Sequence, residues 1–269
     1  MKKSIKILAG ITTILAATTL AACGSSSKND ASKSATDKIK SNGKIVFGIK
    51  QDVPNFGYKD PKTNEYKGVE IDIANKIAKK LGVKADFVPV TAQTRGPLLD
   101  NNQVDAVIAT FTITDERKKT YNFTTPYFTD EAGFLVKKDS GIDSVTDLNG
   151  KTIGVAQSSS TKTGLEALAK DKGIKFEYSE LADYPTLKTA LTSGRIDAFS
   201  VDKSILSGYV DSKTKILGEG FAKQEYGIAT KKTNTELADY LDKEIKLLQS
   251  SGELKKLTDK YDLKDASAK

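Results

Sequence analysis

The sequence predicts an α/β protein built from two doubly wound lobes that are joined by a hinge with two chain crossings. Two observations support this fold class. Strand, helix, strand, helix and strand patterns follow one another from residue 44 to 109, and the same order recurs from residue 152 to 201, as is typical of parallel α/β sheets. The entries into the third strand of each half are also alike, NQVDA at 102–106 and GRIDA at 194–198.

The N-terminal 22 residues have the pattern of a secretory signal peptide, with a basic start, a short apolar segment and then small residues. The sequence Leu20-Ala21-Ala22-Cys23 has the form of a lipoprotein cleavage site, and Cys23 is the only cysteine in the chain. We therefore expect removal of residues 1–22, lipidation of Cys23 and anchoring on the extracellular face of a bacterial cell membrane. The alternative is a plain signal peptide with an unrelated cysteine. Residues 23–42 are polar and lack apolar periodicity, which predicts a disordered tether.

Periodicity and breaker residues define the elements of the first half. The apolar segment 44–49 is predicted to be a strand, and prolines and glycine predict a loop at 50–67. Residues 68–81 are predicted to form an amphipathic helix, since Ile73 and Ile77 share one face with further apolar residues. The remaining elements are a strand at 83–90, a short helix at 97–101, a strand at 104–109, a helix from about 115 and an extended segment at 123–128.

The second half repeats this order after a strand at 132–137. The extended pieces near residues 130 and 226 are expected to cross between the lobes, so that lobe 1 comprises 43–131 plus 227–265 and lobe 2 comprises 132–226. The elements expected beyond residue 137 are strands at 152–156, 174–178, 196–201 and 215–217, helices at 157–170, 184–192 and 202–209, an extended segment at 226–230, and closing helices at 236–248 and 253–261.

The composition excludes several classes of chemistry. The chain has no histidine, which removes Ser-His-Asp catalysis and His-ligated zinc. It contains neither a Gly-x-x-x-x-Gly-Lys-Ser/Thr loop nor a Gly-x-Gly-x-x-Gly fingerprint, and we expect no cofactor and no metal. The net charge is +7, and removal of residues 1–22 would leave 39 basic against 35 acidic residues. This mild, dispersed excess suits a soluble protein and predicts no nucleic-acid partner.

Polar residues gather where the third strand of the first half ends. Thr110 and Thr112 follow the apolar run, and Arg117 lies one turn into the next helix, while Arg95 precedes a Gly-Pro turn upstream. In open α/β sheets, ligands bind beyond the carboxyl ends of strands, and a guanidinium group suits a carboxylate. The spacing alone fits equally well a buried strand with threonine caps and a solvated arginine.

Seven segments, taken together, resemble one protein family. They are IVFGIKQDVP at 45–54, GVEID at 68–72, TRGPLL at 94–99, and the stretches at 109–117, 123–127, 153–161 and 195–202. In these segments the chain resembles the extracytoplasmic solute-binding proteins of ABC amino-acid importers, which implies a periplasmic-binding-protein-like fold of type 2. The resemblance covers residues 44 to 263, and within the family it is greatest to aspartate/glutamate binders.

This resemblance implies roles for the main groups of a free amino acid. Arg117 matches the arginine that holds the ligand α-carboxylate, with Thr112 as a second donor and Thr110 lining the site. Two further matches lie in the second half: Asp202 corresponds to the acid that receives the α-ammonium, and the pair Ser159 and Ser160 corresponds to the serines at a helix start that close over the carboxylate.

The resemblance also implies how the ligand side chain is read. In members that bind acidic ligands, Lys50 and Arg95 match cations that meet the side-chain carboxylate, and Tyr184 matches an aromatic lining residue. Two cations in a dry cleft would favour glutamate or aspartate over a neutral ligand. The bland interpretation of Lys50 is a surface lysine in a lysine-rich chain.

Three functions are consistent with these features. The first is a monomeric binding protein that delivers a polar amino acid, with glutamate or aspartate favoured and glutamine or cystine as alternatives, to an ABC permease and ATPase. The second is a surface adhesin that binds host matrix or mucin. The third is a small lyase or dehydratase on the same fold, for which Asp202 and Tyr184 are the candidate acid/base pair. The absence of histidine weighs against an enzyme.

Overall fold

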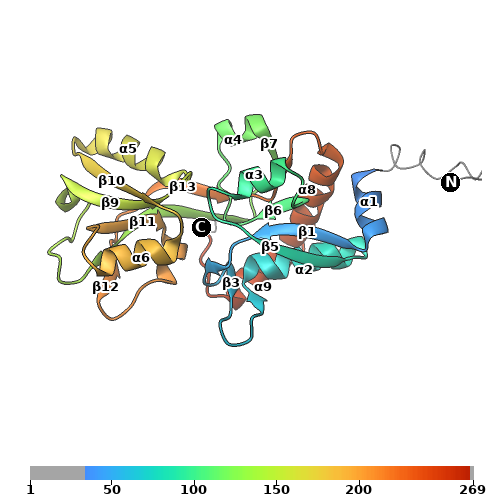
Figure 1. Cartoon of the computed structure of the whole chain (residues 1–269), viewed down its shortest axis with the longest axis horizontal. Coiled ribbons are helices and arrows are strands. Elements are labelled where there is room, and N and C mark those ends of the chain that lie inside the picture. Colours follow the sequence, from blue (N-terminus) through green and yellow to red (C-terminus); the bar gives the residue numbers. More distant parts are fainter. Residues whose placement is uncertain (1–33, 267–269) are drawn as a thin grey trace, which may run out of the picture. The chain divides into compact units, whose positions relative to one another are not determined.

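The computed structural model describes residues 34–266. The predicted signal peptide and Cys23 lie outside this range. Two sheets, one in each predicted lobe, organise the described part of the chain, and Figure 1 shows helices packed around both. The helices are α1 (Ala35–Asn42), α2 (Val69–Leu81), α3 (Arg95–Asp100), α4 (Asp115–Thr120), α5 (Thr161–Lys172), α6 (Tyr184–Thr192), α7 (Lys203–Ser207), α8 (Thr235–Ser250), α9 (Glu253–Lys260) and the 3-10 turn η1 (Thr146–Leu148).

The first sheet has the strand order β5-β1-β6-β14-β7. β1 pairs in parallel with β5 and β6, whereas β14 runs antiparallel to β6 and to β7. Alternate residues of β1 enter different clusters: Phe47 packs with α2 and α8, and Val46 packs with the cluster that contains Leu99 of α3. The sheet is thus covered on both faces, as the parallel pattern predicts. Its strands are β1 (Lys44–Ile49), β5 (Lys84–Pro89), β6 (Ala106–Ile108), β7 (Tyr121–Phe123) and β14 (Ala229–Lys231).

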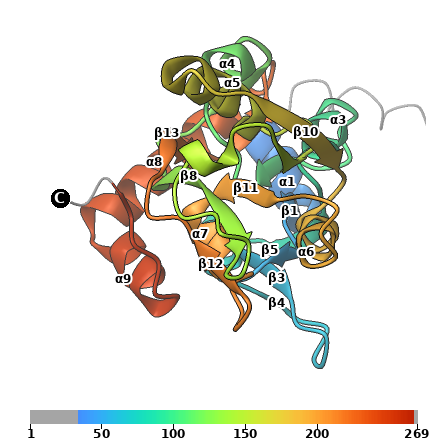
Figure 2. The same cartoon turned by 90° about the vertical axis from the view of Figure 1, so that its left-hand side faces the viewer.

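The second sheet has the order β10-β9-β11-β8-β12, with β13 paired to β8. β9 is parallel to β10 and β11, and β8 is antiparallel to β11, β12 and β13. Helices α5 and α6 lie on opposite faces of this sheet in both views (Figure 1 and Figure 2). Its strands are β8 (Phe128–Lys137), β9 (Lys151–Ala156), β10 (Phe176–Leu181), β11 (Ala198–Asp202), β12 (Thr214–Ile216) and β13 (Phe221–Tyr226).

The chain passes from the first sheet to the second between β7 and β8 and returns between β13 and β14. The predicted fold class, two doubly wound lobes joined by two crossings, is therefore confirmed. The crossing strands β8 and β13 pair with each other from Phe128 opposite Tyr226 to Ala132 opposite Phe221. The strands predicted at 132–137 and 226–230 begin four or more residues later than β8 and β13 do. The reason is that the crossing segment is polar and carries no strand periodicity.

Two other expectations about local structure are wrong. Residues 50–67, predicted to be a loop, contain a small antiparallel sheet of β2 (Asp52–Val53), β3 (Gly57–Lys59) and β4 (Tyr66–Lys67). The prediction of a disordered tether at 23–42 is wrong for Ala35–Asn42, which forms α1, and its residues 23–33 lie outside the described range. Ser34 caps this helix by accepting from the Asp37 N–H, and Gly43 ends it at φ 67°.

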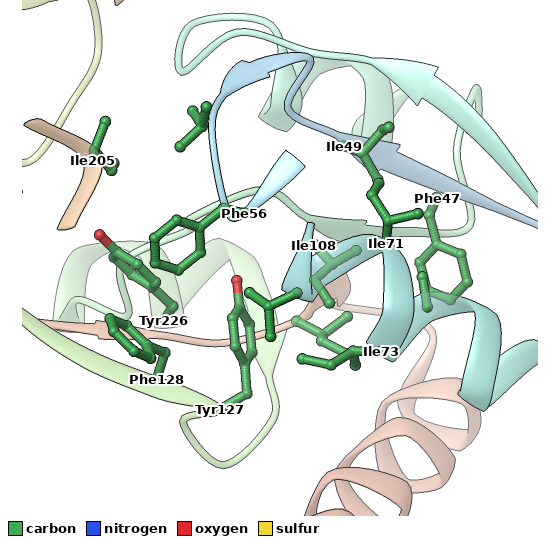
Figure 3. Packing of buried hydrophobic residues seen from close by; sticks show 14 of the residues in the cluster. Phe47, Ile49, Phe56, Ile71, Ile73, Ile108, Tyr127, Phe128, Ile205 and Tyr226 are labelled. Carbon is green, nitrogen blue, oxygen red and sulfur yellow. The ribbon is translucent and has the colours of Figure 1, made fainter. Parts of the chain in front are cut away.

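Aromatic rings pack around the two crossing strands. Figure 3 shows Phe56 beside Phe128 of β8 and Tyr226 of β13, and the ring centroids lie 5.2 and 5.7 Å from that of Phe56. Phe56 and Tyr226 are fully buried. The hinge strands are thereby fixed against the segment that follows β1, which carries Lys50 and Asp52. No helix within residues 34–266 is long and apolar enough to cross a membrane.

Candidate functional site

The site is built on the residues that follow β6. Thr110 is buried and adopts a left-handed conformation at φ 43°, which is uncommon for a residue other than glycine. Its N–H donates to Glu70 Oε1 at 2.6 Å. Thr112 is also buried and bridges Tyr226 of β13, so this segment touches the returning crossing strand. The predicted polar cluster therefore lies where β6 ends, beside the hinge.

Arg117 links this segment to the second lobe. Thr114 caps α4 by accepting from the Arg117 N–H at 3.2 Å. The Arg117 guanidinium donates from Nη1 to the Thr112 carbonyl at 2.8 Å and from Nη2 to the Ser158 carbonyl at 3.2 Å. Burial lowers the pKa of Arg117 to about 9, and the charge of Arg95 lowers it in the same direction. Because burial disfavours the charged form of this guanidinium, a carboxylate partner would stabilise it.

Arg95 is the first residue of α3 and is 3% exposed. Its Nη1 donates to the carbonyls of Ala109 and Thr110 at 2.8 and 3.0 Å, and its guanidinium lies 4.0 Å from the centroid of the Phe111 ring. Its Nε is buried without a hydrogen-bond partner. Burial lowers the pKa of Arg95. The Arg95 side chain, which was expected to project into the cleft, is therefore hydrogen-bonded to the segment that contains Thr110.

Lys50, which the resemblance implied to meet a ligand side-chain carboxylate, is a buried cation with a partner in the protein. It is 1% exposed, its Nζ lies 3.0 Å from Asp52 Oδ1, and it sits 4.6 Å from the centroid of the Tyr184 ring. Burial lowers the pKa of Lys50, and the carboxylate of Asp52 opposes that shift. The interpretation of Lys50 as a solvated surface lysine is wrong, and the buried cation already has a carboxylate partner in the protein.

The second lobe contributes Asp202 at the end of β11. It is 4% exposed and accepts a hydrogen bond from the Tyr226 hydroxyl. The pKa of Asp202 is raised to about 7, because burial and the charge of Asp130 raise it by more than the Tyr226 hydroxyl, Arg95 and Arg117 lower it. Asp202 and the two arginines thus interact electrostatically across the lobes. A buried acid with this pKa is stabilised by a cationic partner.

The serine pair precedes α5. Ser160 directs its hydroxyl to Gln224 Oε1 at 3.1 Å, so that hydroxyl has a protein partner. Ser159 Oγ is buried and has none. Ser158 has a left-handed backbone at φ 59°, and its carbonyl accepts from Arg117. This loop therefore contacts the first lobe through its backbone, and Ser159 rather than Ser160 has a hydroxyl left to donate.

Tyr184 begins α6, where Asp183 caps the helix by accepting from the Thr186 N–H. Tyr184 is 4% exposed, its ring lies under Lys50, and its N–H points to Asp52 Oδ2 at 3.5 Å. The Tyr209 hydroxyl donates to the Asp52 carbonyl. Asp52 of the first lobe thus meets two residues of the second.

Two residues of this region, Asp52 and Glu70, were not among the predicted site residues. Glu70 is fully buried in the first turn of α2 and accepts from the Thr110 N–H and from the Tyr127 hydroxyl. Gly68 permits a close approach of the Phe56 carbonyl to the start of α2, because its φ is 130° and a Cβ there would lie 2.0 Å from the carbonyl oxygen. The available signal was an acid flanked by apolar residues at the start of an amphipathic helix, a position that is normally solvated.

Buried polar atoms without a protein partner gather in this region. Within residues 34–266, buried side-chain atoms of this kind include Glu70 Oε2, Arg95 Nε, Thr110 Oγ1 and Ser159 Oγ. Hydrogen bonds connect the first three of these residues. Since buried polar groups are normally satisfied, such a cluster is typical of a site that binds a polar ligand. The same range contains no cluster of three or more acidic, His or Cys side chains that could hold a metal ion.

Two lobes with a crossing hinge, and charged groups that face one another from both, define a binding protein for a small polar molecule. The chain belongs to the bacterial extracellular solute-binding proteins, family 3, which matches residues 45–264. The chain is thus an extracellular solute-binding protein, and the relatives described next are named for amino acids and, in one case, for an ABC transporter.

Relatives of known function and structure differ in the amino acid they are named for. The chain is 37% identical to the ABC transporter glutamine-binding protein GlnH of Bacillus subtilis over 97% of both chains. It is 32% identical to the L-cystine-binding protein TcyJ of Escherichia coli, over 88% of this chain and 90% of that one. An ancestral arginine-binding protein bound to glutamine superimposes with a TM-score of 0.74 at 34% identity, covering 81% of this chain and 97% of that chain.

Proposed function

We propose that this protein binds L-glutamine between its lobes and delivers it to the permease and ATPase of an ABC importer. The ligand main chain engages residues from both lobes. Arg117, with Thr112 and the Ser159 hydroxyl, receives the α-carboxylate, and Asp202 receives the α-ammonium. The support for these roles is that Arg117 already reaches Ser158 across the lobes and that Asp202 interacts with the charges of both arginines.

The observation that carries glutamine is the ion pair of Lys50 with Asp52 at 3.0 Å. The expectation of glutamate or aspartate rested on Lys50 and Arg95 as two uncompensated cations. Asp52 compensates Lys50, and Arg95 donates to two carbonyls and interacts with the charge of Glu70. A neutral amide therefore leaves no buried cation unpaired, whereas a ligand carboxylate would compete with Asp52 and Glu70.

Ligand binding and hinge closure form one event in this proposal. Neither lobe alone supplies both countercharges of the zwitterion, so the ligand has a higher affinity for the closed form. A shift from mostly open to mostly closed requires a preference of about 5 kcal/mol. Two or three charge-assisted hydrogen-bond groups at about 1.5–3 kcal/mol each supply that difference.

The setting of this function follows from the N-terminal sequence. We propose that Cys23 carries a lipid that holds the monomeric protein at the extracellular face of the membrane, and that lobe 1 comprises 43–131 plus 227–265 and lobe 2 comprises 132–226. The lipoprotein-type motif at Leu20-Ala21-Ala22-Cys23 supports the anchor. A Cys23→Ala variant should be released from membranes into the medium.

Isothermal titration of the purified protein with each common amino acid and with cystine tests the ligand. We expect glutamine to bind most tightly and glutamate and aspartate at least about tenfold more weakly. A preference for glutamate or aspartate over glutamine would overturn the assignment of the ligand. The absence of binding to every amino acid would overturn the proposed function itself.

A further inference from the structure

Glu70 is a charged side chain beneath the site that no role described above uses for ligand binding. Its residue is 0% exposed, and Oε1 accepts from the Thr110 N–H at 2.6 Å and from the Tyr127 hydroxyl at 2.5 Å. Oε2 is buried and has no hydrogen-bond partner in the protein. A buried carboxylate with one unsatisfied oxygen is costly, so its retention calls for a function.

The hydrogen bonds of Glu70 lead directly to the residues of the site. Glu70 holds the Thr110 N–H, and Thr110 stands in the left-handed region at φ 43°. The Thr110 carbonyl, on the other side of that residue, accepts from Arg95 Nη1 at 3.0 Å. Because the conformation of Thr110 sets the direction of its carbonyl, Glu70 positions the Arg95 guanidinium through one intervening residue.

The charge of Glu70 acts on the same groups. Lys50 and Arg95 both interact electrostatically with the Glu70 carboxylate. Asp52 is the partner of Lys50, whereas Glu70 and Asp202 are the acids whose charges act on Arg95. A ligand carboxylate that approached Arg95 would therefore be repelled by the buried carboxylate of Glu70.

We propose that Glu70 is the specificity-determining residue that discriminates against acidic amino acids, by positioning Arg95 through Thr110 and by repelling a side-chain carboxylate. This inference deepens the proposed function, since it concerns the same site and explains how a cleft that contains several cations rejects glutamate. It assigns Glu70 a positioning and electrostatic role, and it requires no contact between Glu70 and the ligand main chain.

The pH dependence of Glu70 provides a second measure of this role. Burial raises the pKa of Glu70 to about 7, whereas the Tyr127 hydroxyl, the Thr110 N–H, Lys50 and Arg95 lower it. The carboxyl is thus charged above pH 7 and neutral below, so the repulsion of glutamate weakens as the pH falls. The side chain of free glutamate has an ordinary pKa of about 4.3 and stays ionised down to pH 5.5. Tyr127 and Tyr184, which face Glu70, have pKa values raised by burial and stay neutral in this range.

The test is the ratio of the dissociation constants for glutamate and glutamine, measured by titration calorimetry on the full folded protein between pH 5.5 and 8. Asp202 also titrates near pH 7, but it meets the α-ammonium that both ligands share, so its effect cancels in the ratio. For the wild type we expect the ratio to fall as the pH decreases. Glu70→Gln, which removes the charge and keeps an acceptor of the same size, should lower the ratio at pH 8 at least about tenfold and make it independent of pH.

One further variant separates the charge of Glu70 from its hydrogen bond, and a second serves as a control on the same helix. Glu70→Asp keeps the charge but is too short for the Thr110 N–H, so it should weaken both ligands and preserve discrimination. Asp72→Asn removes a carboxylate from the same helix, where it pairs with Lys260 at 2.7 Å on the surface, and should leave the ratio unchanged.

The outcomes of the test separate the two proposals. A Glu70→Gln protein with unaltered melting temperature and an unaltered ratio would overturn the inference while leaving glutamine as ligand. If the wild type binds another neutral amino acid best, the proposed ligand is wrong, and the inference stands provided that Glu70→Gln still improves glutamate relative to that ligand. A wild type that binds no amino acid would overturn both.

Discussion

Replacement of Asp52 by asparagine gives a direct test of the charge balance in the site. Asparagine has nearly the same size and keeps an oxygen for the Tyr184 N–H, but it removes the negative charge that lies 3.0 Å from Lys50 Nζ. The Lys50 side chain is 2% exposed, and that of Asp52 is 13% exposed. The variant therefore leaves a buried ammonium group without its countercharge.

The expected cost follows from the burial of the pair. Removal of one member of a buried ion pair typically costs 3–5 kcal/mol, and the partial exposure of Asp52 places this variant at the lower end, at about 3 kcal/mol of unfolding free energy. Part of the cost is relieved when Lys50 loses its proton, because burial already lowers the pKa of that lysine. Lys50→Met combined with Asp52→Asn should recover most of the loss, since no uncompensated charge then remains.

Urea unfolding and calorimetry together measure the effect. In Asp52→Asn, the side-chain carboxylate of glutamate supplies the missing charge, so the preference for glutamine over glutamate should fall at least about tenfold. Asp60→Asn is the matched control, because Asp60 pairs with Lys67 at 2.8 Å on the surface of the same segment. The reasoning would be refuted if Asp52→Asn were no less stable than Asp60→Asn and kept the wild-type preference.

Three further predictions concern the main chain of the ligand and the backbone of the site. Arg117→Ala should weaken glutamine and glutamate alike by at least about 100-fold in calorimetry, because it removes the carboxylate partner; a selective loss of one ligand would contradict its assignment to the α-carboxylate. Glutamine should bind more weakly as the pH falls from 8 to 5.5, because Asp202, with a pKa of about 7, loses the charge that meets the α-ammonium, and Asp202→Asn should bind weakly at every pH. Gly68→Ala should cost more unfolding free energy than Gly82→Ala, because a Cβ at 68 meets a carbonyl oxygen at 2.0 Å while a Cβ at 82 meets open space; the control should lose about 1–2 kcal/mol from its positive φ alone.

The sequence predicted the long elements well because their signals are local. The β1 segment Lys44–Ile49 and the α6 segment Tyr184–Thr192 lie where periodicity and capping residues placed them. The two-residue strands β2 and β4 carry too few residues for any periodicity. Helix α1 has Ile39 as its buried apolar residue, and the Ala35 N–H donates to Glu236 of α8, 201 residues away in sequence. A contact at that separation leaves no local signal.

The sequence suggested which residues form the candidate site, but not the ion pairs and hydrogen bonds among them. The charges of Arg95, Arg117 and Asp202 act on one another in the structure, whereas their roles toward a ligand stay predictions. What the sequence did not reveal is that Lys50 pairs with Asp52 and that a carboxyl on α2 reaches Thr110. Asp60 on the same segment lies 2.8 Å from Lys67, yet this pair is on the surface. Residue type and spacing do not distinguish these two aspartates, because Asp52 is covered by Tyr184 and Tyr209 of the second lobe.

The choice of a neutral ligand side chain rests on the buried acids of the site as well as on its cations. Cations alone suggest an acidic ligand, but the three cations Lys50, Arg95 and Arg117 are opposed by Asp52, Glu70 and Asp202, and the buried Asp130 adds a further acid beside Asp202. A zwitterion adds one charge of each sign and leaves the net charge of the site unchanged. A further carboxylate adds negative charge, and in a region of low dielectric this excess is met most cheaply by a proton on an acid whose pKa already lies near 7. Glu70 and Asp202 are the two such acids, and since Asp202 is committed to the α-ammonium, the proton that admits glutamate belongs on Glu70.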